Sequence, residues 1–277
     1  MRQPCDLLLT NAHVLTMDAE FTTYQGGAVA VRDGAIIAVG DIATKVDPVE
    51  TLDCAGRVVM PGLVNAHTHA PMSLLRGLAD DLRLDVWLMG YMMPVERSFV
   101  SPAFVSLGTQ LSCAEMIRSG TTAFADMYYF ERSVAEAAAN AGLRAVCGQT
   151  VLKFASPDAP SFEDSLAYAR EFVAEWKSHP LIVPAVAPHA PYTCTVDIHL
   201  AETAFEVEQS RREHGMPVIP WIKKQRLFDA RVIAAHCVHI DEGEMRTLRE
   251  AKAGVAHNPS SNLKLASGIA PISKMLE

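Results

Sequence analysis

The sequence lacks the signals of a disulfide-stapled or membrane-spanning protein. Its six cysteines are scattered without a C-x-x-C pair, which argues against a Cys-ligated zinc and favours reduced, mostly buried thiols. No charged segment precedes an apolar run at the start, and apolar stretches such as LIVPAVAP are short and interrupted by proline. Positive charge is also scarce, since 24 Lys+Arg against 32 Asp+Glu give a formal net charge of -8. We therefore expect a cytoplasmic protein with a small-molecule partner and no affinity for nucleic acid or membranes, with homo-oligomerisation left open.

The chain is large enough for one large core and a small satellite domain, with 277 residues of which 49% are hydrophobic. Residues 1–60 contain short β-rich runs separated by Gly-Gly and Asp-Gly turns, which predicts a small β-sheet domain. Residues 61–277 alternate strand-like and helix-like segments, which is typical of parallel strands with helical crossovers. We predict an α/β fold with an incomplete TIM-type barrel.

The barrel segment contains seven expected strands and glycine-terminated helices. The helices are expected to end at Gly120, Gly142 and Gly254. The strands are expected at residues 62–69, 121–127, 143–149, 181–188, 196–200, 231–237 and 254–258.

Histidines stand at the ends of most of these strands, where barrel enzymes place their active sites. Two of them, in the segment GLVNAHTH, are one residue apart, so an extended strand points both imidazoles to the same side. Glu202 follows in the segment HLAE, where a carboxylate can reach water bound to a metal held by His199. The histidines at strand ends are His67, His69, His189, His199, His236 and His257.

Four segments, PGLVNAHTH, HLAE, AAHCVH and HNPSSNLKLASGIAP, together resemble the amidohydrolase superfamily. The resemblance covers nearly the whole chain and is greatest for the branch of methylthioadenosine and S-adenosylhomocysteine deaminases, with the related triazine hydrolases. It implies a (β/α)8-type metal-dependent hydrolase barrel, of which seven strands are visible, and a small β-sandwich domain to which residues 1–60 contribute. It also implies one divalent metal ion, zinc in the first place and iron or manganese as alternatives.

The resemblance also assigns roles to individual residues. It makes His67, His69 and His199 the metal ligands, Glu202 the proton shuttle, and His236 the group that orients or deprotonates the attacking water. The implied activity is deamination of an adenosine-like or other aminated N-heterocycle by attack of a metal-bound hydroxide. Substrate contacts are expected from Glu96 in MPVER and His189 in APHAPYTC, while Gln149 stands where some relatives carry an arginine for a substrate carboxylate.

Two expected parts of the family fold are missing from the sequence. Only nine residues separate His189 from His199, too few for a crossover helix between parallel strands. The sequence also ends before an eighth strand and before the aspartate that completes the metal shell in this family. We expect residues to be missing near Thr195-Val196, visible as a break between neighbouring Cα atoms, rather than a true fragment or degenerate relative.

Two other functions stay open. The same attack on a ring carbon could displace chloride or an alkylamine from a triazine-type ring. Alternatively, the chain is an inactive metal-binding fragment of this family, although the presence of Glu202 and His236 argues for catalysis.

Overall fold

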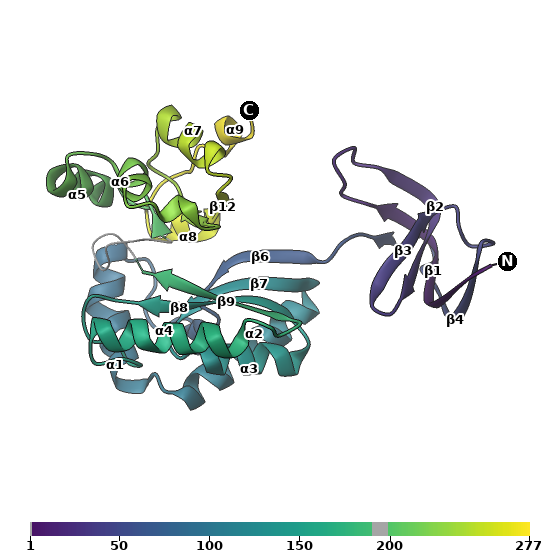
Figure 1. The fold of residues 1–277 in the computed structure, drawn as a ribbon, viewed down its shortest axis with the longest axis horizontal. Helices are drawn as coiled ribbons and strands as arrows, with labels where there is room; N and C mark the ends of the chain where they lie inside the picture. The colour runs from purple at the N-terminus through teal and green to yellow at the C-terminus, as the bar shows by residue number, and fades with distance from the viewer. Residues whose placement is uncertain (1, 190–198) are drawn as a thin grey trace. The chain divides into compact units, whose positions relative to one another are not determined.

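The computed structural model describes residues 2–189 and 199–277, which divide into two compact units, Met1–Leu63 and Val64–Glu277 (Figure 1). The first unit is a five-stranded sheet in the order β3-β2-β1-β4, with β5 paired to β1. Its Asp33-Gly34 turn has both residues at positive φ, as a tight antiparallel hairpin requires. The strands are β1 (Gln3–Leu15), β2 (Thr23–Arg32), β3 (Ala35–Gly40), β4 (Val46–Asp53) and β5 (Val58–Val59).

The small sheet domain of the first unit has its own apolar interior. Cys5, Leu8, Ala12 and Val14 of β1 are buried, and Ala30 of β2 packs on the same side as Leu8. Completion of this sheet into a sandwich stays a prediction.

The second unit carries strands at all seven expected places, arranged in two sheets. Four strands follow the order β6-β7-β8-β9 and three the order β10-β11-β12, and β7, β8 and β9 pair in parallel, as do β10, β11 and β12. Within residues 2–189 and 199–277 no strand pairing joins β9 to β10, so barrel closure stays a prediction. The strands are β6 (Leu63–Thr68), β7 (Thr121–Tyr128), β8 (Arg144–Val151), β9 (Ile182–Pro188), β10 (His199–Leu200), β11 (Ile233–His236) and β12 (Gly254–Ala256).

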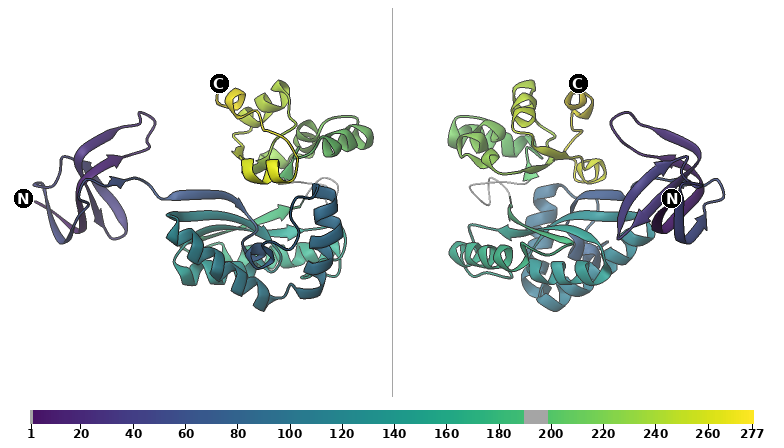
Figure 2. Two further views of the ribbon diagram at one scale, coloured as in Figure 1. Left: turned by 180° about the vertical axis from the view of Figure 1, so that it is seen from behind. Right: turned by 45° about the vertical axis from the view of Figure 1, so that its right-hand side comes forward.

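Helices α2 (Pro102–Arg118), α3 (Glu131–Ala141) and α4 (Phe162–Trp176) lie along one face of the four-stranded sheet (Figures 1 and 2). Phe124 of β7 and Phe172 of α4 are buried in the core between them. The remaining helices are η1 (Ala70–Leu75), η2 (Val86–Met92), α1 (Met93–Phe99), α5 (Ala204–His214), α6 (Val218–Lys224), η3 (Leu227–Asp229), α7 (Glu242–Glu250), α8 (Pro259–Lys264) and α9 (Ile272–Leu276).

Two of the three predicted helix ends are correct. Gly142 caps α3 with φ 76, and Gly120, with φ 83, follows the cap of α2. The third prediction is wrong, because α7 ends at Glu250, with Ala251 as its C-cap, and Gly254 begins β12. The reason is that Lys252 takes the left-handed conformation at φ 52, so the chain leaves the helix before it reaches the glycine.

The sequence predicts reduced, buried cysteines, no membrane-spanning segment and a break in the chain after β9. Among the described cysteines, Cys5, Cys54, Cys113, Cys147 and Cys237 are free and buried. No described helix combines the length and the apolar composition needed to cross a membrane. The expected break near Thr195-Val196 lies outside the described residues.

Candidate metal centre and active site

Three histidines from three strands of the second unit form a compact cluster. His67 lies near the end of β6, His199 begins β10 and His236 ends β11, and their ligand nitrogens lie within 4.8 Å of one another. The Nε2 atoms of His67 and His199 are 3.1 Å apart. His199 and His236 are almost fully buried. The cluster is therefore a shielded, all-imidazole site.

Hydrogen bonds at Nδ1 fix the direction in which these rings point. Nδ1–H of His199 donates to the carbonyl oxygen of His189 at 2.8 Å, and Nδ1–H of His236 donates to Oδ1 of Asn262 at 2.7 Å. Nδ1–H of His69 donates to the carbonyl oxygen of Met127 at 2.6 Å. With the proton on Nδ1, each of these rings presents an Nε2 lone pair, which is the atom that coordinates a metal.

The clustered imidazoles are held in the neutral state. Burial, together with the neighbouring imidazoles, lowers the pKa of His67 to about 2 and the pKa of His199 well below its ordinary range. Burial also lowers the pKa of His236. Neutral imidazole is the form that binds divalent metals, so no proton has to leave before an ion is bound.

The donor set fits a divalent metal such as zinc. Two imidazole nitrogens bound to one zinc ion lie about 2.9–3.4 Å apart, because each Zn–N bond is about 2.0–2.1 Å long. The 3.1 Å between the Nε2 atoms of His67 and His199 falls in this range. Two lone pairs facing each other at this distance repel unless a cation or a proton lies between them.

The closest trio of histidines differs in one member from the ligand set that the sequence predicts. The sequence predicts His69 as the third ligand, whereas the compact trio contains His236. The ring of His69 remains close, with its centroid 4.9 Å from that of His67 and 5.4 Å from that of His199. The structure thus brings all four rings together, and the division of roles between His69 and His236 stays a prediction.

Glu202 lies beside this cluster, as the sequence predicts for a proton shuttle. Its Oε1 is 3.6 Å from Nδ1 of His236 and accepts a hydrogen bond from Oγ of Ser267 at 3.3 Å. The side chain is buried, and burial raises the pKa of Glu202 to about 7. A carboxyl group with this pKa can accept and release a proton near neutral pH.

Glu96, which the resemblance suggests as a substrate contact, is buried. It lies in α1 with 5% exposure, and its Oε1 accepts a hydrogen bond from the hydroxyl of Tyr128 at 2.8 Å. Burial raises the pKa of Glu96 to about 7. The Tyr128 ring is 6.4 Å from the ring of His69, so the pair lies near the histidine cluster.

His189, the other expected substrate contact, lies close to the histidine cluster, whereas Gln149 is bonded within the fold. The ring of His189 lies 5.2 Å from that of His199. Gln149 is fully buried, and its amide is used inside the protein: Nε2 donates to Oδ2 of Asp158 at 2.7 Å, and Oε1 accepts from the Glu131 backbone at 3.2 Å. Gln149 therefore has a structural role in β8.

Sequence reasoning missed several residues that orient the site. Asp126 of β7 accepts hydrogen bonds at Oδ1 from Oγ1 of Thr68, 2.5 Å away, and from the backbone of Ala70, 2.6 Å away. Thr68 and Ala70 are the neighbours of His69 in the sequence, so Asp126 fixes the backbone on both sides of His69. Asn262 and Ser267, which contact His236 and Glu202, belong to the recognised segment HNPSSNLKLASGIAP and could have been proposed from it.

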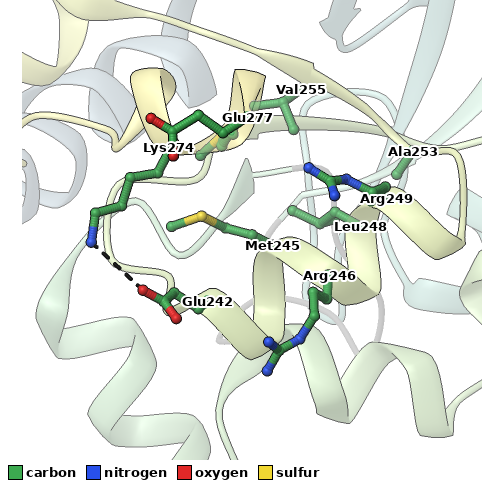
Figure 3. Close-up of a pocket in the computed structure, with 10 residues that line it drawn as sticks. Glu242, Met245, Arg246, Leu248, Arg249, Ala253, Val255, Lys274 and Glu277 are labelled. Atoms are coloured by element: carbon green, nitrogen blue, oxygen red, sulfur yellow. Dashed lines mark ion pairs between the residues drawn. The ribbon is translucent and has the colours of Figure 1, made fainter.

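A hollow of about 490 Å³ lies elsewhere, between α7, β12 and α9 (Figure 3). Its lining includes Met245, Leu248 and Val255, with an ion pair between Lys274 and Glu242 at 3.8 Å. None of the clustered histidines lines it. The hollow is therefore separate from the histidine cluster.

Comparison with known proteins finds similarity over most of the chain. A model of the amidohydrolase family matches residues 58–277. The chain is 46% identical to a 5-methylthioadenosine/S-adenosylhomocysteine deaminase of Syntrophobacter fumaroxidans, over 98% of this chain and 66% of that protein. It is 43% identical to a protein of the same description from Nitratidesulfovibrio vulgaris, over 100% of this chain and 67% of that protein. The chain thus spans about two thirds of the length of these curated relatives.

The alignment with the Nitratidesulfovibrio protein runs over 296 positions, whereas the chain has 277 residues. The relative therefore has residues within the matched region that are missing from this chain.

Solved structures show the same fold. An adenosine deaminase from Xanthomonas campestris with bound zinc superposes with a TM-score of 0.92 at 38% identity, over 100% of this chain and 67% of that chain. A triazine hydrolase from Arthrobacter aurescens gives a TM-score of 0.89 at 18% identity, over 98% and 69% of the two chains. The second likeness is one of fold alone.

Proposed function

Because the chain belongs to the amidohydrolase family, we propose that it is a metal-dependent aminohydrolase that removes the exocyclic amino group of an adenosine-like or other aminated N-heterocycle. The observation that carries this proposal is the buried Glu202 carboxyl beside a cluster of neutral imidazoles. The names of the relatives at 43–46% identity support the same reaction and the same class of substrate.

We assign His67, His69 and His199 as the metal ligands and His236 as the group that orients or deprotonates the attacking water, and the proximity of the four rings supports this assignment. These ligands would hold a divalent ion, zinc in the first place, and when bound the ion would supply the activation of water for attack on an electrophilic ring carbon. Zinc in the Xanthomonas adenosine deaminase supports this choice of metal.

Glu202 moves the protons of the reaction. In the proposed sequence it takes a proton from the attacking water and delivers it to the ring nitrogen beside the reacting carbon. A second proton, taken from the hydroxyl group now attached to the ring carbon, is transferred to the amino group, so that the carbon–nitrogen bond breaks, ammonia leaves and the carbon–oxygen double bond forms. Ser267 holds Oε1 of Glu202 during these transfers, and the pKa of about 7 allows Glu202 to serve in both directions.

Glu96 and His189 are the proposed contacts of the ribose-like part of the substrate. A carboxylate such as Glu96, held by the Tyr128 hydroxyl, can accept hydrogen bonds from a diol. The amide of Gln149 is already used within the fold, which favours neutral nucleosides over substrates that carry a carboxylate at that position.

The test is turnover by the zinc-loaded, full-length protein on a panel of adenosine, 5′-methylthioadenosine, S-adenosylhomocysteine, a pterin and a chlorotriazine. We expect ammonia release from the neutral adenosine-like compounds. Chloride release from the triazine without ammonia release from any purine would instead favour the triazine-hydrolase alternative. Stoichiometric zinc binding without turnover of any compound would favour the inactive alternative.

A further inference from the structure

Glu206 is a buried carboxyl group whose two oxygens both bind the loop that carries Glu202. Oε1 accepts a hydrogen bond from the backbone N–H of Ala201 at 2.8 Å, and Oε2 accepts one from the backbone N–H of Glu202 at 2.9 Å. The side chain is 3% exposed and forms no ion pair with a described lysine, arginine or histidine. A buried carboxyl group without a cation needs such donors, and here the loop supplies both.

Ala201 has an unusual backbone conformation for a residue with a side chain. Its φ is 50, in the left-handed region, and it is completely buried. This conformation is strained for a residue that carries a Cβ atom. It is held from two sides, because its N–H binds Glu206 and its carbonyl oxygen accepts bonds from the backbones of Val238 and His239 at 3.0 and 2.9 Å.

The left-handed turn determines where Glu202 points. In an extended strand, residues three positions apart point to opposite faces, so a straight continuation of β10 would direct His199 and Glu202 away from each other. The turn at Ala201 breaks this alternation. As a result, His199 lies in the histidine cluster and Oε1 of Glu202 is 3.6 Å from Nδ1 of His236.

We propose that Glu206 is a positioning residue, which holds the Ala201–Glu202 backbone in its left-handed turn and thereby directs the Glu202 carboxyl group at the histidine cluster. The inference rests on the proposed function in that Glu202 is the proton shuttle. Glu206 is not a second shuttle, since backbone donors bind both of its oxygens. Thr203 is the N-cap of α5, and its Oγ1 accepts a hydrogen bond from the backbone N–H of Glu206 at 3.2 Å. This bond fixes Glu206 in the first turn of the helix, next to the loop that it holds.

The test compares Glu206→Gln with Glu244→Gln in the full-length, zinc-loaded protein. The amide of Glu206→Gln has one oxygen and one N–H₂ group, so one of the two loop N–H groups loses its acceptor. Glu244 is the matched control: it is 3% exposed, and its Oε2 accepts the Asp241 backbone N–H at 3.0 Å in the capping box of α7. Glu244 contacts neither Glu202 nor the described histidines of the cluster.

We expect Glu206→Gln to lower kcat at least about tenfold, since small misplacements of a reacting group have effects of this size. KM and zinc content should stay within about twofold of the unmutated protein. Amide hydrogen exchange in residues 200–203 should become faster in Glu206→Gln and stay unchanged in Glu244→Gln. The control variant should also keep full kcat, because glutamine retains the acceptor oxygen of the capping box. Unchanged kcat and unchanged exchange in Glu206→Gln would overturn the proposal.

The experiment also gives an answer if Glu206→Gln does not fold or if the unmutated protein has no deaminase activity. If Glu206→Gln does not fold, Glu206→Asp retains both acceptors on a shorter side chain and should give a reduced kcat with faster exchange in residues 200–203. Full kcat in Glu206→Asp together with faster exchange would contradict the positioning role. If the unmutated protein releases no ammonia from any substrate, the proposed function fails, and the exchange comparison alone decides whether Glu206 holds the loop.

Discussion

Nδ1 of His236 lies 2.7 Å from Oδ1 of Asn262, a residue with no exposed surface. Because an amide oxygen can only accept, the proton of His236 must be on Nδ1, and Nε2 presents its lone pair to the cluster. The backbone of His236, with φ 72, is in the left-handed region, so both backbone and side chain of this residue are held in a specific orientation. Asn262 thus acts on the site through His236.

Replacement of this amide should lower turnover. In Asn262→Ala the imidazole loses the acceptor that fixes its tautomer, and we expect kcat/KM to fall about 10- to 100-fold, the usual range for partners of metal-site histidines. Steady-state kinetics at constant zinc content measures this. Asn262→Asp retains an acceptor at the same place and should recover part of the loss. Equal kinetics for the unmutated protein and Asn262→Ala would contradict the role of Asn262.

Removal of the proton shuttle should separate catalysis from metal binding. Glu202→Gln keeps the volume and a hydrogen-bond acceptor for Ser267 but cannot carry a proton. We expect turnover to fall at least about a hundredfold while zinc content and melting temperature are retained. Metal analysis and kinetics on the same preparation decide this. A protein that loses zinc together with activity would instead make Glu202 a structural residue.

The metal assignment predicts a loss of zinc binding. His67→Ala and His199→Ala each remove a nitrogen from the pair whose Nε2 atoms are 3.1 Å apart, and zinc should no longer bind stoichiometrically in competition with a chelator. His13→Ala, in the separate sheet domain, is the matched control and should bind one equivalent. Undiminished zinc binding in both cluster variants would place the metal elsewhere.

Asp126 should influence zinc affinity without contacting the ion. Its Oδ1 accepts the Thr68 and Ala70 donors on either side of His69, so Asp126→Ala should free this segment and weaken zinc binding about 10- to 100-fold. Competition with a fluorescent chelator gives the affinity. Ser165→Ala, which removes a buried hydroxyl from α4 that donates to the carbonyl of Thr150, should leave it unchanged. A similar loss in both variants would indicate general destabilisation.

Glu96 should make stability depend on pH. Burial raises its pKa in the folded state to about 7 from 4.5, so the folded protein binds the proton more tightly than the unfolded chain. The contribution of Glu96 is fully present below pH 4.5 and is lost as the pH rises through about 7. The loss is at most about 1.4 kcal/mol for each pH unit in this window.

Melting curves across this window for the unmutated protein and Glu96→Gln isolate the effect, because the amide of the variant does not titrate. Tyr128 and Tyr129, the neighbours that interact with Glu96, remain neutral there, since burial raises the pKa of both hydroxyls. We expect the stability of Glu96→Gln to fall less as the pH rises. Parallel curves would show that Glu96 is ionised in the folded protein.

The sequence alone determined the positions of the strands and the residues at their ends. The alternation of strand-like and helix-like segments predicted all seven strands of the second unit. This was possible because hydrophobic periodicity and glycine turns depend on a few neighbouring residues. The spacing of His67 and His69 placed two imidazoles near one point. The recognised segments identified the family.

Tertiary structure alone decided how these side chains face one another. Whether His69 or His236 completes the closest trio depends on backbone turns such as φ 72 at His236 and on hydrogen-bond partners from distant segments. Glu96 carries no local mark of burial, and only the packing of α1 near Tyr128 removes it from water. Glu206 has the spacing of an ordinary helix-start carboxylate, and its contact with Ala201 arises because the preceding loop folds back onto the first turn of α5. Local sequence specifies conformation over a few residues, whereas the direction of a side chain in the site is fixed by contacts between segments that the fold brings together.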